Sequence, residues 1–179
     1  MKKKTKLVIR EWVESLVVAF ILAMIIRIFI VQAFKIPTSS MEPTLMRGDR
    51  ILVNKFIYRF KEPERWDIVV FKYPLNPKKD FIKRLAAKEG EKVTIINGRV
   101  FIDNKMVDNP YLSEYYSNQG DYGRENLKIN IPKDNLFALG DNSFNSKDSR
   151  YWGFVPRKNL IGKAFLIYWP LNRIKILNK

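Results

Sequence analysis

The chemistry open to this 179-residue chain is limited first by what it lacks, because it contains no His and no Cys. Ser-His-Asp and Cys-His catalysis, zinc fingers and disulfide frameworks are therefore excluded. A Ser or Thr nucleophile would need activation by Lys or by a carboxylate. Hydroxyl groups concentrate in the Pro-flanked segment Thr38-Ser39-Ser40. Taken alone, this segment is also typical of an ordinary turn-rich linker.

Lys83 is a candidate base, because it follows the apolar residues Phe81 and Ile82 in a possible strand. A Lys at this position could simply face solvent. If it points inward instead, desolvation lowers its pKa toward neutrality, and the neutral amine becomes a usable base. Such an amine can take the proton of a Ser hydroxyl and later give it to a leaving amine.

The loop from Gly140 to Gly153 is dense in polar residues, but its spacing does not fit a calcium loop. Counted from Asp141, the sixth residue is Ser146 rather than Gly, and the twelfth is Trp152 rather than Glu. No Ser in the chain is followed by Lys three positions later, which excludes the site of penicillin-binding proteins and β-lactamases. We therefore expect no metal and no cofactor.

A long apolar segment precedes these residues. Leu16 to Ile26 contains no polar side chain, and apolar residues continue beyond it after a single Arg. As a helix, residues 15–34 would approach the ~30 Å hydrocarbon thickness of a bilayer, so we expect one transmembrane helix over residues 11–34. The basic tail 1–10 predicts a cytoplasmic N-terminus and an extracytoplasmic location for residues 35–179. Two alternatives are a signal peptide cleaved after Val31-Gln32-Ala33 and a buried core helix.

Beyond residue 35 the pattern changes to short runs of β-branched and aromatic residues separated by turn residues, which predicts a mostly β domain. The dipeptide Asn97-Gly98 predicts a tight hairpin, since both central positions of a type I′ turn need positive φ. Asp103-Asn104 indicates a second turn. The polar residues 108–126 are expected to form a surface excursion. The strand candidates are Ile51–Tyr58, Trp66–Tyr73, Val93–Ile96, Val100–Ile102, Asn135–Leu139 and Ala164–Trp169.

Four segments together resemble the bacterial type I signal peptidases, which are membrane-anchored Ser-Lys endopeptidases. They occur in the family's order after the apolar segment, and the resemblance covers nearly the whole chain. The segments are Ser40-Met41-Glu42-Pro43-Thr44-Leu45, Gly48–Val53, Asp67–Pro74 leading to Ile82-Lys83-Arg84, and Gly140–Asn142 through Asp148–Arg150 to Trp152-Gly153. The resemblance implies an antiparallel β-sheet catalytic domain that removes N-terminal signal peptides from exported preproteins.

The resemblance also implies roles for individual residues. Ser40 would be the nucleophile and Lys83 the general base. Ser146 would hydrogen-bond the Lys amine and orient it. Asp148 and Arg150 would form a supporting ion pair. These five side chains make up the expected catalytic site.

An oxyanion hole is implied at the backbone N–H of Ser40, with the hydroxyl of Thr38 as a second donor. Ser39 stands where some members of the family carry Gly. On sequence position alone Ser39 is also a rival nucleophile. The Ser-Met pairing of the family favours Ser40 instead.

The resemblance further implies an apolar groove that binds the substrate as an added strand, with pockets for small residues at positions one and three before the cut. Ile36, Met41, Leu45 and Ile82 are expected to line this groove or to face the membrane, with burial in the core as the alternative. A site a few residues past a membrane helix would stay near the membrane surface. The basic surface of the domain would then contact anionic lipid headgroups.

Net charge supports a second class of function, because 33 Lys and Arg against 18 Asp and Glu give +15. A membrane-tethered β-barrel that binds nucleic acid or another polyanion would use this charge, with Tyr and Phe as stacking platforms. That hypothesis does not explain Ser40 and Lys83, and it places nucleic acid outside the cell, so we expect no nucleic-acid partner. An inactive homologue and a repressor-type Ser-Lys autopeptidase are further alternatives. The intact candidate site argues against the first, and the apolar segment 11–34 against the second.

Overall fold

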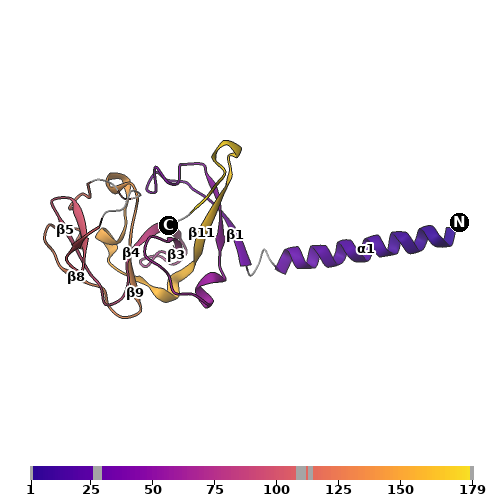
Figure 1. Ribbon diagram of the computed structural model, residues 1–179, viewed down its shortest axis with the longest axis horizontal. Helices are drawn as coiled ribbons and strands as arrows, with labels where there is room; N and C mark the ends of the chain where they lie inside the picture. The colour runs from indigo at the N-terminus through magenta and orange to yellow at the C-terminus, as the bar shows by residue number, and fades with distance from the viewer. Residues whose placement is uncertain (1, 26–29, 108–111, 113–114, 178–179) are drawn as a thin grey trace.

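The computed structural model describes residues 2–25, 30–107, 112 and 115–177. An N-terminal helix, α1 (Lys2–Ile25), stands apart from the β domain that follows it (Figure 1). The strands are β1 (Val31–Lys35), β2 (Arg50–Asn54), β3 (Ile68–Lys72), β4 (Asp80–Ala87), β5 (Lys92–Ile96), β6 (Arg99–Ile102), β7 (Lys105–Met106), β8 (Ile129–Asn130), β9 (Asn135–Leu139), β10 (Val155–Pro156), β11 (Leu160–Trp169) and β12 (Lys175–Ile176). The short helices are η2 (Ile57–Arg59), η3 (Ser143–Asn145), α2 (Ser149–Trp152), η4 (Arg157–Asn159) and η5 (Leu171–Arg173).

Two sheets form the domain, and every strand pairing among the described residues is antiparallel. The larger sheet has the order β1-β2-β11-β3-β4-β9-β10, with β12 pairing with β11. The smaller sheet has the order β7-β6-β5-β8. The expectation of a mostly antiparallel β domain is therefore confirmed. β4 lies inside the larger sheet, which places its second half among buried neighbours.

The N-terminal segment differs from the expected helix over residues 11–34. Val31–Lys35 form β1 and pair along their whole length with β2, so the expected helix end is wrong. β-branched and aromatic residues suit a strand as well as an apolar helix, which is why the pattern did not separate the two. Residues 26–29 of the expected span lie outside the described residues. None of the helices in the described ranges is both long enough and apolar enough to cross a membrane.

Both turn predictions are confirmed. Asn97 and Gly98 have φ angles of 47° and 73° and join β5 to β6. Asp103 and Asn104 have φ angles of 50° and 64° and join β6 to β7. Gly, Asn and Asp adopt positive φ at low cost, so local sequence is enough to determine these turns.

The strand expected over Ile51–Tyr58 is shorter in the structure, because β2 ends at Asn54. The Asn54 side chain accepts hydrogen bonds from the backbone N–H groups of Phe56 and Ile57, at 2.9 and 3.0 Å. This local turn replaces the strand ladder and leads into η2.

The segment 108–126, expected to form a surface excursion, also contributes buried residues. Residues 108–111 and 113–114 lie outside the described residues, but Tyr116 and Ser117 are buried. The Tyr116 hydroxyl donates a hydrogen bond of 2.8 Å to the carbonyl oxygen of Gly140. The prediction of a surface excursion is therefore wrong at Tyr116 and Ser117, because the segment returns there to pack against the polar loop after β9.

Candidate active site

Lys83 points inward from β4 and is only 5% exposed. Its strand pairs with β3 on one side, where Lys83 lies opposite Val69. From Lys83 to Ala87 every residue of β4 is buried, so the strand has no solvent-facing side over this stretch. The sequence left open whether Lys83 faces solvent or the interior, and the structure places it in the interior.

Ser40 lies in a tight connection that follows β1. The Ile36 N–H donates to the carbonyl oxygen of Asp49 and the Gly48 N–H donates to that of Ile36, both at 2.8 Å. These bonds close the connection into a compact loop. The Ser40 carbonyl oxygen accepts a hydrogen bond of 3.1 Å from the Asn142 N–H. The loop after β9 therefore anchors the backbone of Ser40 directly.

The side chains of Ser40 and Lys83 meet although they are 43 residues apart in the chain. The Lys83 Nζ donates a hydrogen bond of 2.8 Å to the Ser40 Oγ and another of 3.0 Å to the Ile82 carbonyl oxygen. Burial lowers the pKa of Lys83 from 10.5 to about 8, against the opposing attraction of the Asp148 and Asp141 carboxylates. The pair therefore combines a buried hydroxyl with an amine that loses its proton within reach of neutral pH.

The neighbouring hydroxyl residues occupy different positions. Thr38 is exposed, and its Oγ1 lies 3.4 Å from the Ser40 Oγ. Ser39 is half-buried, and its carbonyl oxygen accepts a hydrogen bond of 3.1 Å from the Glu42 N–H. Of the two rival serines, it is Ser40 that receives the hydrogen bond of Lys83.

Ser146 is buried near this pair, but its Oγ forms no hydrogen bond within the described part of the chain. The expected bond from Ser146 to the Lys83 amine is therefore not formed in this structure. Ser146 packs closely on Gly140, where an added Cβ would lie 2.1 Å from the Ser146 Oγ and 2.5 Å from the Ser40 carbonyl oxygen. Only Gly leaves room for these two groups at position 140.

Asp148 and Arg150 form a fully buried ion pair. The Arg150 Nε lies 2.8 Å from Asp148 Oδ1, and a second guanidinium nitrogen lies 2.9 Å from Oδ2. Asp148 also caps α2 through the Arg150 N–H at 3.2 Å and accepts the Gly140 N–H at 3.0 Å. This pair therefore holds the end of β9 and the start of α2 together, beside Ser146.

A groove of about 360 Å³ opens beside Ser40 and Lys83. Ile36, Met41 and Ile82 line it, as does Thr38. Leu45 does not; it is fully buried in a core cluster with Met41, because the turn in which the Leu45 N–H bonds the Met41 carbonyl oxygen directs it inward. Three of the four expected apolar residues thus lie at the groove.

One edge of β4 is open along this groove. β9 pairs with β4 only from Arg84 to Ala87. Among the described residues, the first half of β4, Asp80 to Lys83, therefore has a strand partner only in β3. An unpaired strand edge beside an apolar groove can accept an extended peptide as an additional strand.

Comparison with known proteins assigns the sequence of this chain to a family. The family model described as signal peptidase, peptidase S26, matches residues 9–169. The chain belongs to the signal peptidase family. The resemblance to bacterial type I signal peptidases, which remove signal peptides from exported preproteins, is thereby confirmed.

Individual relatives of this signal peptidase match over most of their length. A probable signal peptidase I-2 of Synechocystis sp. is 41% identical, over 98% of this chain and 82% of the relative. Signal peptidase I of Aquifex aeolicus is 34% identical, over 89% and 84%. Signal peptidase IB of Staphylococcus aureus strain COL is 36% identical, over 98% and 95%. A solved signal peptidase I from Enterococcus faecalis V583 has 30% identity and a TM-score of 0.48, covering 57% of this chain and 97% of that one.

The structure adds to this signal peptidase a buried charge pair that sequence reasoning did not assign. The Arg84 Nε and a second guanidinium nitrogen each lie 2.7 Å from an oxygen of Asp141, and both side chains have no exposed area. The Thr44 hydroxyl donates to Asp141 at 2.5 Å, and Arg84 also donates to the Trp66 carbonyl oxygen at 2.9 Å. Arg84 directly follows Lys83 on β4, and Asp141 precedes Asn142, whose N–H bonds the Ser40 carbonyl oxygen, so the pair connects β4 to the loop that anchors Ser40.

A second group missed from the sequence surrounds Arg150. Its guanidinium donates to the hydroxyls of Ser117 and Ser143, each at 2.9 Å, and to the Ser143 carbonyl oxygen at 2.7 Å. Ser143 in turn accepts the Ser117 N–H at 2.9 Å. A buried aromatic, Tyr116, packs below the guanidinium, 5.1 Å from it. The one available signal was Tyr116 within an otherwise polar segment. Within the described ranges, no group of three or more carboxylates could hold a metal ion.

Proposed function

We propose that this protein is a serine endopeptidase that removes signal peptides, with Ser40 as the nucleophile and Lys83 as the general base. The hydrogen bond of 2.8 Å between the Lys83 amine and the Ser40 hydroxyl carries the proposal. Because the chain has no His, an amine with a lowered pKa is a suitable group to take the hydroxyl proton.

The reaction proceeds in two halves. In the first, neutral Lys83 takes the Ser40 proton while the Ser40 Oγ bonds to the substrate carbonyl carbon. The tetrahedral intermediate then collapses, the C–N bond breaks, and the departing amine receives the proton from Lys83. In the second half, Lys83 takes a proton from water, the hydroxide attacks the ester, and Ser40 leaves with that proton. The signal peptide departs with a new carboxylate and the mature chain with a free amino terminus.

The developing oxyanion would receive hydrogen bonds from the Ser40 N–H and the Thr38 hydroxyl. The short distance between the Thr38 and Ser40 hydroxyls, 3.4 Å, supports this pairing. The side chain of Thr38 is exposed at the groove, so it can turn toward the substrate without breaking a buried contact. Replacing the Thr38 hydroxyl should therefore lower kcat more than it raises KM.

The supporting residues would act on the position of the amine. We assign Ser146 as the partner that Lys83 gains when its bond to Ser40 is broken during attack. The Oγ of Ser146 is buried and has no hydrogen-bond partner among the described residues. This supports the role, since leaving a buried hydroxyl without a partner is costly and a new bond would remove that cost. The ion pair of Asp148 and Arg150 would keep the backbone next to Ser146 fixed.

The substrate would lie along the open edge of β4 as an extended strand, with small side chains before the cut directed into the groove. Ile36, Met41 and Ile82 supply apolar walls to the groove of about 360 Å³. The family resemblance favours Ala, Gly or Ser at positions one and three before the cut.

Attachment to a membrane also belongs to the proposal. Several apolar side chains of α1, including Leu16 and Phe20, are more than half exposed, so in water they would leave a large apolar surface unburied. We propose that the apolar segment from residue 11 to the start of β1 anchors the chain, with the basic residues 1–10 in the cytoplasm and the β domain outside, where it contacts anionic lipids. Labelling of a Cys introduced at Lys3, against one introduced at Lys175, in intact cells tests this orientation.

Cleavage of a preprotein with Ala at positions one and three before the cut tests the function. The purified full chain, in neutral detergent, should release a mature chain whose N-terminus, read by mass spectrometry, begins at the expected residue. The matched control is the same preprotein with Trp at the position before the cut. Equal cleavage of both, or cleavage at unrelated sites, would contradict the proposed groove specificity.

A further inference from the structure

Two exposed aromatic rings stack on each other beside the loop that follows β9. Phe144 belongs to η3, and Tyr115 belongs to the segment that returns to pack against this loop. The ring centroids lie 6.1 Å apart and the ring planes differ by 9°. Phe144 is nevertheless 69% exposed and Tyr115 47% exposed. These two rings, called the aromatic platform below, therefore present apolar surface that a further side chain can cover.

The backbone on both sides of the platform is fixed by buried contacts. Tyr115 packs on the hairpin turn between β5 and β6, where an added Cβ at Gly98 would overlap the ring. The N–H that follows Tyr115 donates a hydrogen bond of 2.8 Å to the Gly98 carbonyl oxygen. The other ring directly follows Ser143, whose carbonyl oxygen accepts 2.7 Å from buried Arg150. The platform is thus held in place before any ligand arrives.

The groove at Ser40 and Lys83 reaches the neighbourhood of this platform. Asp80 lines the groove at one end, and Asn145 and Lys147 line it at the other. Asn145 directly follows Phe144 in η3. A peptide that leaves the groove at this second end would therefore pass beside the aromatic platform.

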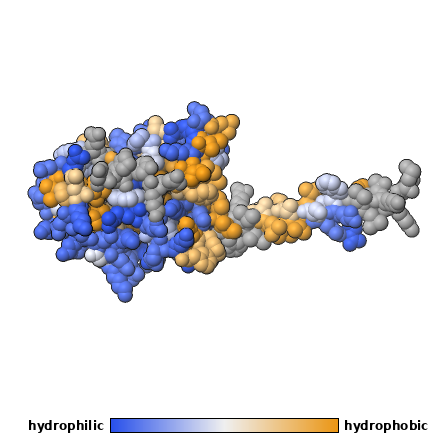
Figure 2. All heavy atoms as spheres, in the orientation of Figure 1, coloured by the Kyte–Doolittle hydropathy of each residue, from blue (hydrophilic) through white to orange (hydrophobic). Residues whose placement is uncertain are grey.

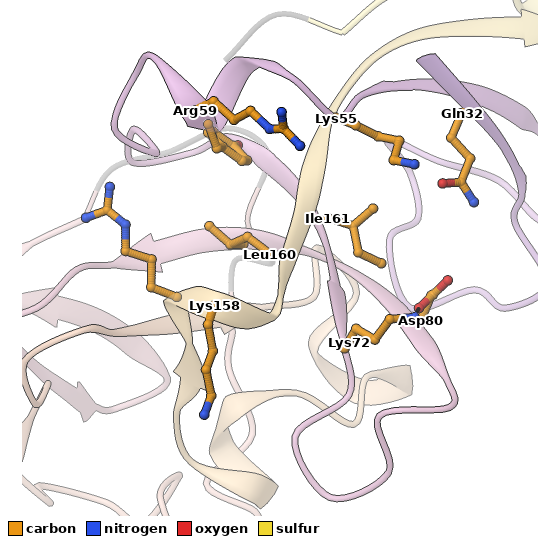
Figure 3. Close-up of a pocket in the computed structure, with 10 residues that line it drawn as sticks. Gln32, Lys55, Arg59, Lys72, Asp80, Lys158, Leu160 and Ile161 are labelled. Atoms are coloured by element: carbon orange, nitrogen blue, oxygen red, sulfur yellow. Dashed lines mark hydrogen bonds and ion pairs between the residues drawn. The ribbon is translucent and has the colours of Figure 1, made fainter. Parts of the chain in front are cut away.

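The end of the groove at Asp80 is the one closer to α1. Asp80 and Gln32 of β1 both line a second cavity, of about 560 Å³ (Figure 3). Figure 1 shows α1 leaving the domain beside β1, whereas β5 and β8 of the smaller sheet lie at the opposite end. Figure 2 shows hydrophobic side chains gathered where α1 joins the domain. If the membrane lies at this end, the apolar part of a signal peptide arrives there, and residues before the cut lie toward Asp80.

The substrate chain after the cut cannot continue along β4. Among the described residues, the free edge of β4 ends at Lys83, because β9 pairs with the strand from Arg84 onward. The chain must turn away over the loop after β9, where the Asn142 N–H bonds the Ser40 carbonyl oxygen at 3.1 Å. Phe144 follows two residues later, so its Cα lies within about 8 Å of that of Asn142. An extended chain covers about 7–10 Å in two or three residues, which brings the platform within reach.

We propose that Phe144 and Tyr115 bind an apolar side chain at the second or third position of the mature chain. Neighbouring side chains of an extended peptide point to opposite faces, so one of these two positions faces the rings. The inference rests on the proposed peptidase function and deepens it, because it adds a preference on the far side of the cut. The aromatic platform would thus help to determine which preproteins are cut well.

The test uses two peptide substrates that share Ala at positions one and three before the cut. They differ only after it, with Phe or with Ser at both the second and the third position. We measure kcat and KM in neutral detergent for the wild type, Phe144→Ala, Phe144→Tyr and the control Phe60→Ala, with circular dichroism to confirm folding. Phe60 is a matched control, because it is 71% exposed, pairs with the ring of Phe56 at 4.6 Å and does not line the groove.

We expect the wild type to favour the Phe peptide about three- to tenfold in kcat/KM, as for one aromatic contact. Phe144→Ala should reduce this ratio to less than about twofold, chiefly by raising KM for the Phe peptide. Phe144→Tyr keeps the ring and should keep the ratio, as should Phe60→Ala. A ratio near one in the wild type, or an unchanged ratio in Phe144→Ala, would overturn the proposal.

A purely structural role of the rings would give a different result. Phe144 is two residues from Ser146, so a disturbed loop would lower kcat on both peptides alike and leave their ratio unchanged. Equal losses of kcat on the two peptides in Phe144→Ala would therefore overturn the proposal in favour of loop positioning.

Binding to an inactive variant separates this inference from the proposed function. We expect folded Ser40→Ala to bind the Phe peptide more tightly than the Ser peptide by a similar factor in calorimetric titration, and Ser40→Ala/Phe144→Ala to lose the difference. A wild type that cleaves neither peptide, beside a Ser40→Ala variant with this preference, would refute the peptidase proposal and leave the aromatic platform as a peptide site. Equal cleavage of the two peptides by the wild type would refute the platform and leave the peptidase proposal intact.

Discussion

The rate of cleavage should rise with pH through about pH 8, because only the neutral amine of Lys83 can accept the proton of Ser40. With a pKa of about 8, about a tenth of the amine is neutral at pH 7. At its ordinary value of 10.5 the neutral fraction would be about 1 in 3,000. Burial of Lys83 therefore raises the amount of neutral amine at this pH about 300-fold.

The assay is the pH dependence of kcat/KM for a peptide substrate without titratable groups, from about pH 6 to about pH 10. We expect kcat/KM to rise about tenfold per pH unit below pH 7 and to level off above about pH 9. Ser39→Ala serves as the control and should give the same profile. A flat profile, or a rise that continues to the ordinary pKa of Lys, would refute the assignment of Lys83 as a buried base.

The same pKa shift has a consequence for stability, with the sign set by proton binding. Between about pH 8 and 10.5 the unfolded chain holds the Lys83 proton while the folded chain does not. This difference in proton binding therefore raises the free energy of unfolding as the pH rises through that window, by up to about 3 kcal/mol. Below pH 8 Lys83 is charged in both states, so the full cost of burying its ammonium group lowers the stability of the fold. In Lys83→Met, chemical denaturation should show this pH dependence removed.

Three other substitutions test the surroundings of the site. Asp141→Asn leaves the buried Arg84 without its carboxylate and should lower the free energy of unfolding by about 3–5 kcal/mol. Asp121→Asn, which breaks an exposed ion pair, should lower it by less than about 1 kcal/mol. Similar losses for the two variants in urea titrations would contradict the argument from burial. Gly140→Ala should lower the free energy of unfolding by about 1–3 kcal/mol and impair cleavage, because the added methyl group would overlap Ser146. A variant with the melting temperature and activity of the wild type would show that the contact is not tight. Ser146→Ala should lower kcat with no loss of thermal stability, since the Ser146 Oγ has no hydrogen bond within the part of the chain that the structure describes. An unchanged kcat would remove the proposed role of Ser146.

The parts of the fold that could be predicted are those in which local sequence decides the backbone. The turns at Asn97-Gly98 and Asp103-Asn104 need positive φ, and few other residues allow it. The end of β2 depended on one side chain, Asn54, whose competing hydrogen bonds a propensity pattern does not reveal. The run from Val31 was ambiguous for a physical reason, because Val, Ala and Phe fit the end of a membrane helix and a strand at a sheet edge alike.

The pairing of Ser40 with Lys83 was predicted from family resemblance rather than from spacing. Nothing in the sequence brings Ser40 near Lys83, because their contact is made by the pairing of β4 with β3 and by the loop after β1. The Arg84–Asp141 pair lay beyond prediction for the same reason: the sequence gives charges, and the fold decides which of them are buried together. The position of Leu45 could not be predicted either, because an apolar side chain fits both the groove and the core.

The most direct test of the proposed mechanism compares the wild type with Ser40→Ala, Lys83→Ala and Ser39→Ala on one preprotein, with circular dichroism to confirm folding. We expect cleavage by the wild type, nearly unchanged cleavage by Ser39→Ala, and no detectable cleavage by folded Ser40→Ala or Lys83→Ala. An active Lys83→Ala enzyme would contradict the Ser-Lys mechanism, and an active Ser40→Ala enzyme would contradict the choice of nucleophile.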